Sequence, residues 1–161
     1  MHPHAVLIET FYASFARRDA AAMGACYHAD AHFSDPAFPD LDAAGVRAMW
    51  TMLCAAGKDL RVEYSAIDAD DQHGRAHWDA HYTFSGTGRA VLNRIDAQFS
   101  FRDGLIVEHR DVFDFHRWAT QALGLPGRLF GGTQWLQRKV QVQAATRLAA
   151  WRDHHPEQAG R

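Results

Sequence analysis

Residues 99–115, FSFRDGLIVEHRDVFDF, have the pattern of a β-hairpin in which two alternating arms flank a tight turn at residues 102–104. Successive side chains of a strand point to opposite faces of the sheet. In the second arm, His109, Asp111 and Phe113 therefore share one face, and Glu108 and Arg110 share the other. The first of these faces continues with aromatic residues, so we expect His109 and Asp111 to point into the protein interior.

Three stretches before this arm alternate in the same way. Their apolar positions are Leu60, Val62, Tyr64 and Ala66; Ala76, Trp78, Ala80, Tyr82 and Phe84; and Ile95, Ala97, Phe99 and Phe101. Half-buried strands that are joined by short turns pair with their sequence neighbours in an antiparallel manner. The sequence therefore predicts a four-stranded antiparallel meander.

Helical periodicity precedes the strands. Apolar residues recur every three or four positions over residues 5–16, which predicts a first helix. Asp19 is expected to cap a short second helix over residues 20–27, and Asp42 to open a third helix that ends near Ala56.

The helical pattern returns at His116, is interrupted at residues 124–132 (GLPGRLFGG) and resumes in a final helix. An apolar stripe marks that helix, formed by Leu136, Val140, Ala144, Leu148 and Trp151. Helices followed by a strand meander and more helices predict an α+β fold, with the first helices packed on one face of a curved antiparallel sheet.

The composition limits the class of protein. A chain of 161 residues with 47% hydrophobic and 22% charged residues is most simply a single globular unit. The net charge of −2 provides no basic surface for nucleic acid. Without a basic leader or an apolar run of membrane-spanning length, we expect a cytoplasmic protein with no membrane partner. Cys26 and Cys54 are expected to be reduced core residues.

The order of elements, together with CYHADAHFSDPAF (residues 26–38) and the closing hairpin, resembles the nuclear transport factor 2-like superfamily. More narrowly, the chain looks like the SnoaL-like and ketosteroid-isomerase-like proteins. The resemblance implies a cystatin-like cone over residues 1–115, which encloses an apolar pocket and commonly dimerises. Residues 116–161 look like a C-terminal helical extension packed on the same domain.

The resemblance also suggests a site. Ketosteroid isomerase has its catalytic aspartate where this chain has Asp35, and the same match places His109, Asp111 and Phe113 on the pocket side. The oxyanion-hole tyrosine and aspartic acid of the isomerase are replaced by Phe11 and Ala97. Steroid isomerisation would therefore lose both of its hydrogen-bond donors.

Asp35, His109 and Asp111 are accordingly the candidate catalytic residues. A carboxylate among aromatic side chains has a raised pKa, and a nearby histidine can pass on its proton. We expect cofactor-free proton transfer on a small apolar molecule: isomerisation, dehydration, cyclisation or hydrolysis. Tyr12, Trp78, Tyr82, Phe99 and Phe113 are expected to shape the cavity.

Two other interpretations stay open for these residues. Asp35 would cap a turn before Pro36, and His109 and Asp111 would be buried structural groups that hydrogen-bond each other or the backbone. The fold would then serve as a non-catalytic ligand-binding protein or as a dimerisation module.

The opposite sheet face is polar. His77, Asp79 and His81 have a spacing that could hold a divalent metal, but they lack an identifiable fourth ligand, so we predict no metal site. Arg94, Asp96, Glu108 and Arg110 belong to the same face, which would be either solvated or the interface of a homodimer.

Overall fold

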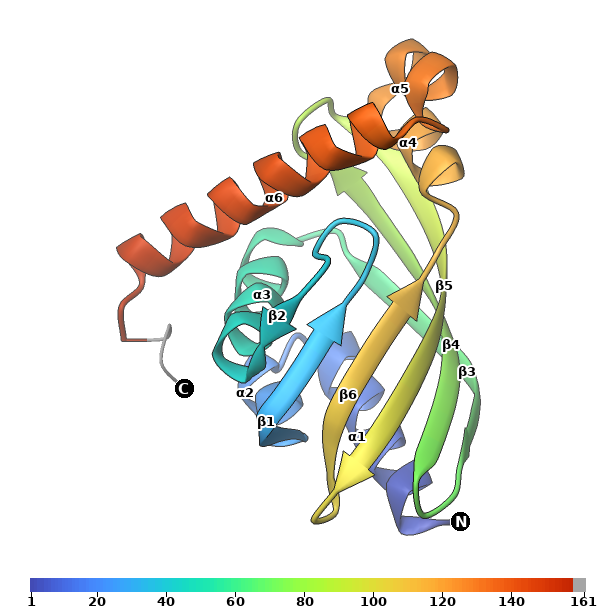
Figure 1. Cartoon of the computed structure of the whole chain (residues 1–161), viewed down its shortest axis with the longest axis vertical. Helices are drawn as coiled ribbons and strands as arrows, with labels where there is room; N and C mark the ends of the chain where they lie inside the picture. Colours follow the sequence, from blue (N-terminus) through green and yellow to red (C-terminus); the bar gives the residue numbers. More distant parts are fainter. Residues whose placement is uncertain (158–161) are drawn as a thin grey trace.

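A computed structural model describes residues 1–157 as one curved sheet with helices against one of its sides (Figure 1). The helices are α1 (Pro3–Ala16), α2 (Ala20–Ala25), α3 (Ala43–Ala56), α4 (Phe115–Leu123), α5 (Leu125–Phe130) and α6 (Gln134–His154). The strands are β1 (Tyr27–Ser34), β2 (Leu41–Asp42), β3 (Arg61–Ala69), β4 (His73–Phe84), β5 (Arg89–Arg102) and β6 (Leu105–Val112). The predicted α+β class and cone-like curved sheet are confirmed.

The six strands lie in the order β2-β1-β6-β5-β4-β3. The predicted meander corresponds to β3 to β6, and its antiparallel pairing is confirmed. The expectation of a purely antiparallel sheet is wrong, because β1 runs parallel to β6. This pairing joins segments that lie far apart along the chain, so the pattern of neighbouring strands does not reveal it.

The second helix was predicted to reach Tyr27, but α2 ends at Ala25 and β1 starts at Tyr27. Strand β1 alternates in sequence, with Tyr27, Ala29, Ala31 and Phe33 on one face, but two of these four positions are alanine, which favours helices and weakens the strand signal. Tyr27, Ala31 and Phe33 are buried, whereas Ala29 is exposed where the register against β6 shifts between Tyr27 and His32.

The turn between β5 and β6 has the predicted tight geometry. Asp103 and Gly104 both have positive φ angles, 53° and 75°, as a two-residue type I′ turn requires. Ala66 in β3 also has a positive φ, 55°, at a shift in the register with β4. This irregularity turns Ala66 outward, against the predicted alternation, and brings Ile67 to the core side.

Helices α1 and α3 cover the sheet with aromatic side chains. The ring centroid of Phe15 lies 5.0 Å from the ring centroid of Trp50 on α3 and 5.3 Å from that of Trp78 on β4. Asp42 caps α3 as predicted, because its Oδ1 accepts the N–H of Gly45 at 2.8 Å. These contacts fix α3 over the sheet.

The C-terminal helices complete the fold. The predicted interruption at residues 124–132 contains the short helix α5, in which Pro126 lies in the first turn, where a missing N–H is tolerated. Helix α6 (red in Figure 1) runs from the α4–α5 end back past α3, and its predicted stripe faces inward, with Leu136 and Leu148 buried. The last four residues of the predicted extension lie outside the described residues. No helix within residues 1–157 is long and apolar enough to cross a membrane.

Candidate functional site

A cavity of about 560 Å³ lies between the sheet, α3 and the C-terminal helices. Apolar side chains form most of its wall, including Phe15, Met49, Trp50, Trp78, Phe113 and Val140. Its polar lining includes Asp35, Tyr82, Asn93 and Asp111. A mostly apolar wall with a few polar groups is typical of a small-molecule site.

Asp35 directly follows β1, and its carboxyl group is held by the turn that it starts. Its Oδ1 accepts the N–H groups of Ala37 at 2.8 Å and Phe38 at 2.6 Å. No partner for Oδ2 is found among residues 1–157. Burial raises the pKa of Asp35 to about 7; the two N–H groups oppose this shift, and the charge of Asp111 adds to it. One oxygen is therefore engaged in the turn, and the other remains for proton exchange near neutral pH.

His109 and Asp111 are both buried, as the alternation of β6 predicted, with exposed fractions of 1% and 3%. His109 Nε2 lies 2.9 Å from Asp111 Oδ1, and His109 Nδ1 lies 2.7 Å from Tyr27 Oη. Tyr27 Oη in turn accepts the indole N–H of Trp50 at 2.9 Å. Four side chains from three separate elements thus form one buried chain of hydrogen bonds.

The direction of this chain assigns the histidine proton. An indole nitrogen only donates, so the hydroxyl proton of Tyr27 is directed to His109 Nδ1. His109 then carries its own proton on Nε2 and donates it to Asp111. In this arrangement His109 orients the carboxyl group of Asp111.

Two members of this chain of hydrogen bonds, Asp111 and Trp50, reach the cavity that Asp35 also lines, whereas His109 and Tyr27 do not. The structure therefore brings the two predicted carboxylates to one volume and places His109 in a second layer. Tyr27 and Trp50 are not among the predicted site residues, because β1 was not predicted as a strand and Trp50 on α3 meets Tyr27 only in the folded protein.

Trp78, Tyr82 and Phe113 line the cavity, whereas Tyr12 and Phe99, which were also expected to do so, do not. Phe99 lies directly across from His109 in the sheet, with the two rings 4.4 Å apart. Tyr12 is fully buried and stacks on Tyr64 at 5.7 Å. Both residues face the interior as predicted, but they pack in the core below the cavity floor.

Tyr82 offers a donor to the cavity. Its Oη accepts the indole N–H of Trp118 at 2.8 Å, so its own proton is not needed for that bond. Burial raises the pKa of Tyr82; the bond from Trp118 opposes this shift, and the charge of Asp35 adds to it. The hydroxyl group therefore remains protonated and able to donate.

Asn93 also lines the cavity but is not among the residues predicted to do so. It precedes Ile95 by two positions, so a longer reading of the same alternation would have placed it on the cavity face.

Helix α6 holds the Asp35 turn in place. The side-chain amides of Gln137 and Gln141 donate to the carbonyl oxygen of Pro36 at 3.3 and 3.1 Å. Lower along the helix, Arg147 donates to Ser85 at 3.1 Å beside the cavity. The C-terminal helix thus supplies one wall of the site and positions one of its carboxylates.

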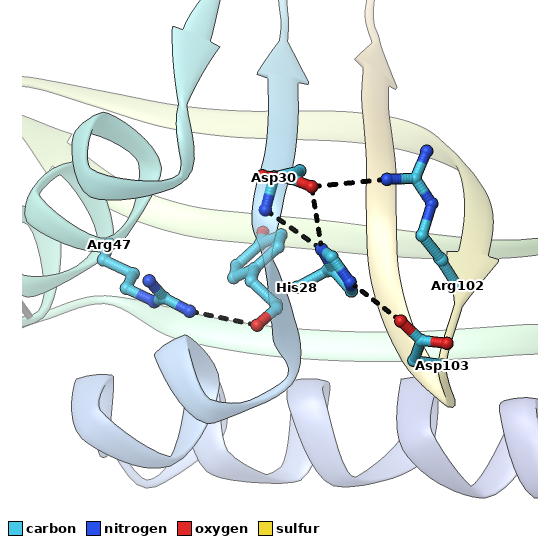
Figure 2. A network of polar contacts seen from close by, with 6 residues as sticks. His28, Asp30, Arg47, Arg102 and Asp103 are labelled. Atoms are coloured by element: carbon cyan, nitrogen blue, oxygen red, sulfur yellow. Dashed lines mark hydrogen bonds and ion pairs between the residues drawn. The ribbon is translucent and has the colours of Figure 1, made fainter.

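The strand that carries Tyr27 is anchored by the polar network shown in Figure 2. Arg47 on α3 donates to the backbone oxygen of Tyr27 at 3.0 Å. His28 contacts Asp103 at 3.2 Å, and Arg102 contacts Asp30 at 3.4 Å, both across to the β5–β6 hairpin. These contacts set the start of β1 beside the hairpin.

The polar outer face does not gather metal ligands. His77 uses both ring nitrogens, each at 2.9 Å, on Asp96 and Asp79, while His81 lies 3.8 Å from Glu63. Bonds to these carboxylates, chiefly to Asp96, raise the pKa of His77. Across the part of the chain that the structure describes, no group of three potential ligands converges on a metal position.

Comparisons with known proteins agree with this architecture. Residues 8–109 match the model of the SnoaL-like domain. A protein with a ketosteroid isomerase-like fold from Catenulispora acidiphila has 14% identity and a TM-score of 0.64 over 76% of this chain and 95% of its own. A comparison with curated proteins finds no match.

Two further solved structures share the fold. IdmH from Streptomyces antibioticus, described as a proposed polyketide cyclase, has 23% identity and a TM-score of 0.63 over 77% of this chain and 100% of its own. An LEH-like epoxide hydrolase from M. tuberculosis has 18% identity and a TM-score of 0.61 over 79% of this chain and 95% of its own. At these identities, the likeness concerns the fold.

Proposed function

Because the chain belongs to the SnoaL-like domain family, we propose that it is a cofactor-free enzyme that binds a mostly apolar small molecule and moves a proton with Asp35. One observation carries this proposal. A carboxyl group with a pKa of about 7 lines an apolar cavity and has one oxygen without a partner among residues 1–157. A group that titrates near neutral pH is suited to act as a general base and then as an acid.

In the proposed reaction, Asp35 removes a proton from a carbon next to a carbonyl group of the ligand. Negative charge then develops on the carbonyl oxygen, and the hydroxyl group of Tyr82 is a donor that could stabilise it. Isomerisation, dehydration and aldol-type cyclisation share this step. In a hydrolysis, Asp35 would instead take a proton from water.

Asp111 and His109 serve this site together. Asp111 lines the same cavity, and its charge helps to keep the pKa of Asp35 near neutral. His109 is a positioning residue in this scheme, since both of its ring nitrogens are engaged and it does not reach the cavity. Two proteins of the same fold, one described as a polyketide cyclase and the other as an epoxide hydrolase, support the broader part of the proposal, which is a reaction on a small organic molecule.

Proton abstraction can be tested with 2-tetralone, an apolar ketone with an acidic C–H group. In D₂O, NMR would follow the exchange of its C1 hydrogens with and without the protein. We expect faster exchange with the wild-type protein, a rate that rises with pH through about 7, and loss of the enhancement in Asp35→Asn. Asn keeps an oxygen for the N–H groups of Ala37 and Phe38, so the turn should persist.

Asp59→Asn is the matched control, because Asp59 also lines the cavity, is exposed and has a lowered pKa. Equal enhancement by the wild-type protein and Asp35→Asn would refute the role of Asp35.

The second candidate function is ligand binding without turnover. Both ring nitrogens of His109 are engaged, one by Tyr27 and the other by Asp111. This network favours the binding function, because it also fits a purely structural role for His109. Thermal stabilisation by 2-tetralone with no enhanced exchange would support this alternative.

A further inference from the structure

Asn93 on β5 takes no part in the proposed proton transfer, yet it is a buried polar residue in the cavity wall. It is 8% exposed and lines the cavity wall. Within residues 1–157, its side-chain amide makes no hydrogen bond. An amide can donate twice and accept twice, so Asn93 brings unused hydrogen-bonding capacity to the cavity wall.

The surroundings of Asn93 give it no structural task. The backbone of the preceding residue, Leu92, is already satisfied by Gln121 on α4, which accepts its N–H at 2.8 Å and donates to its carbonyl at 3.0 Å. Directly across the sheet lies Ala80, whose small side chain leaves room beside the amide. The Asn93 side chain is therefore free to contact a molecule in the cavity.

The strand register places Asn93 at a distance from Asp111. Asp111 lies opposite Ala97, and Asn93 precedes Ala97 by four positions on the same strand. At about 3.3 Å per residue, the two rows are about 13 Å apart along the sheet. The cavity joins them, because it is lined by both residues.

We propose that Asn93 is a specificity-determining residue that hydrogen-bonds a carbonyl or hydroxyl oxygen of the ligand at the end remote from Asp111. The ligand class is then an elongated apolar molecule with a hydrogen-bonding oxygen at each end. This inference rests on the proposed function, in that it needs the cavity to bind a small molecule, but it does not need turnover.

Two probes separate the contribution of the remote oxygen. 2,6-Dihydroxyanthraquinone has a hydroxyl group at both ends of an elongated ring system, and 2-hydroxyanthraquinone has one at a single end. We expect the wild-type protein to bind the dihydroxy compound about fivefold more tightly, as one hydrogen bond to a neutral group allows. Asn93→Leu, which keeps a similar volume, should bind both compounds with nearly equal affinity.

Gln98→Leu is the matched control, because it makes a similar change on the exposed face of the same strand. It should preserve the fivefold preference. The melting temperature of Asn93→Leu should not fall, because the change removes a buried amide that has no partner. A lower melting temperature would instead indicate a structural role and overturn the inference.

The outcomes distinguish this inference from the proposed function. If both compounds bind the wild-type protein but Asn93→Leu retains the preference, the role of Asn93 is refuted and the ligand pocket stands. If neither compound binds, the specificity inference fails, while the 2-tetralone exchange experiment still judges proton transfer on its own.

Discussion

Tyr27 and His109, which are 82 positions apart in the sequence, share a buried hydrogen bond of 2.7 Å. This contact links β1 to β6 and sets which nitrogen of His109 faces Asp111. The orientation of a cavity carboxylate therefore depends on a tyrosine that lies outside the cavity.

Replacing Tyr27 by Phe should destabilise the protein. The change removes the partner of His109 Nδ1 and leaves the indole N–H of Trp50 buried without an acceptor. We expect the free energy of unfolding to fall by about 1–3 kcal/mol, measured by urea denaturation. Tyr64→Phe is the control, because Tyr64 bonds Glu9 at a half-buried position, and it should cost less than about 1 kcal/mol. Equal losses in the two variants would contradict the importance of the buried chain.

Asp35 should make the protein less stable as the pH rises. Its folded-state pKa of about 7 lies above the ordinary value of 3.8, so between these values the folded protein holds a proton that the unfolded chain has released. The stability contribution of this proton is lost as the pH rises through that window. Asp35→Asn should therefore gain stability over the wild-type protein from pH 4 to pH 8, by at most about 4 kcal/mol.

Urea denaturation at the two pH values would measure this difference, with the exposed change Glu108→Gln as the control. A difference between Asp35→Asn and the wild-type protein that does not vary with pH would show that Asp35 titrates normally.

Gln141 should keep the Asp35 turn closed. Its amide donates to Pro36, and the turn is closed by the N–H groups of Ala37 and Phe38. In Gln141→Ala, we expect hydrogen exchange at these two N–H groups to be roughly fivefold faster, as the loss of one hydrogen bond allows. Gln134→Ala, an exposed change at the start of the same helix, should leave both rates unchanged. Unchanged rates in Gln141→Ala would mean that α6 does not restrain the turn.

The outer sheet face remains our candidate for a homodimer interface. Val112 is 41% exposed there, directly across from Asp96, near Arg94 and Arg110. We expect light scattering to give twice the chain mass of 18.1 kDa, and Val112→Arg to shift it towards the monomer by replacing an apolar contact with a long charged side chain, which interface cores disfavour. Val142→Arg on α6, at a side chain that is 65% exposed, is the control. A wild-type mass of one chain would rule out this dimer.

Local patterns were sufficient for much of the fold. The I′ turn at Asp103 and Gly104, the capping of α3 by Asp42 and the inward direction of His109 each follow from residues close together in the chain. Strand β1 was not found in this way, because two of its four inward positions, Ala29 and Ala31, are alanine and give a weak strand signal, and its partner β6 is remote in sequence. The outward turn of Ala66 was missed for a related reason, since a single irregular residue reverses the alternation.

For the site, the sequence by itself determined which residue types face inward, because a strand repeats every two residues whatever surrounds it. That sufficed for Asp111, Trp78, Tyr82 and Phe113. Only the tertiary structure decided that Asp35 shares a cavity with Asp111, and that His109 and Phe99 lie behind the cavity wall. The reason is physical: facing inward is a property of one strand, but the depth of a side chain depends on how helices from distant parts of the chain fill the space above it.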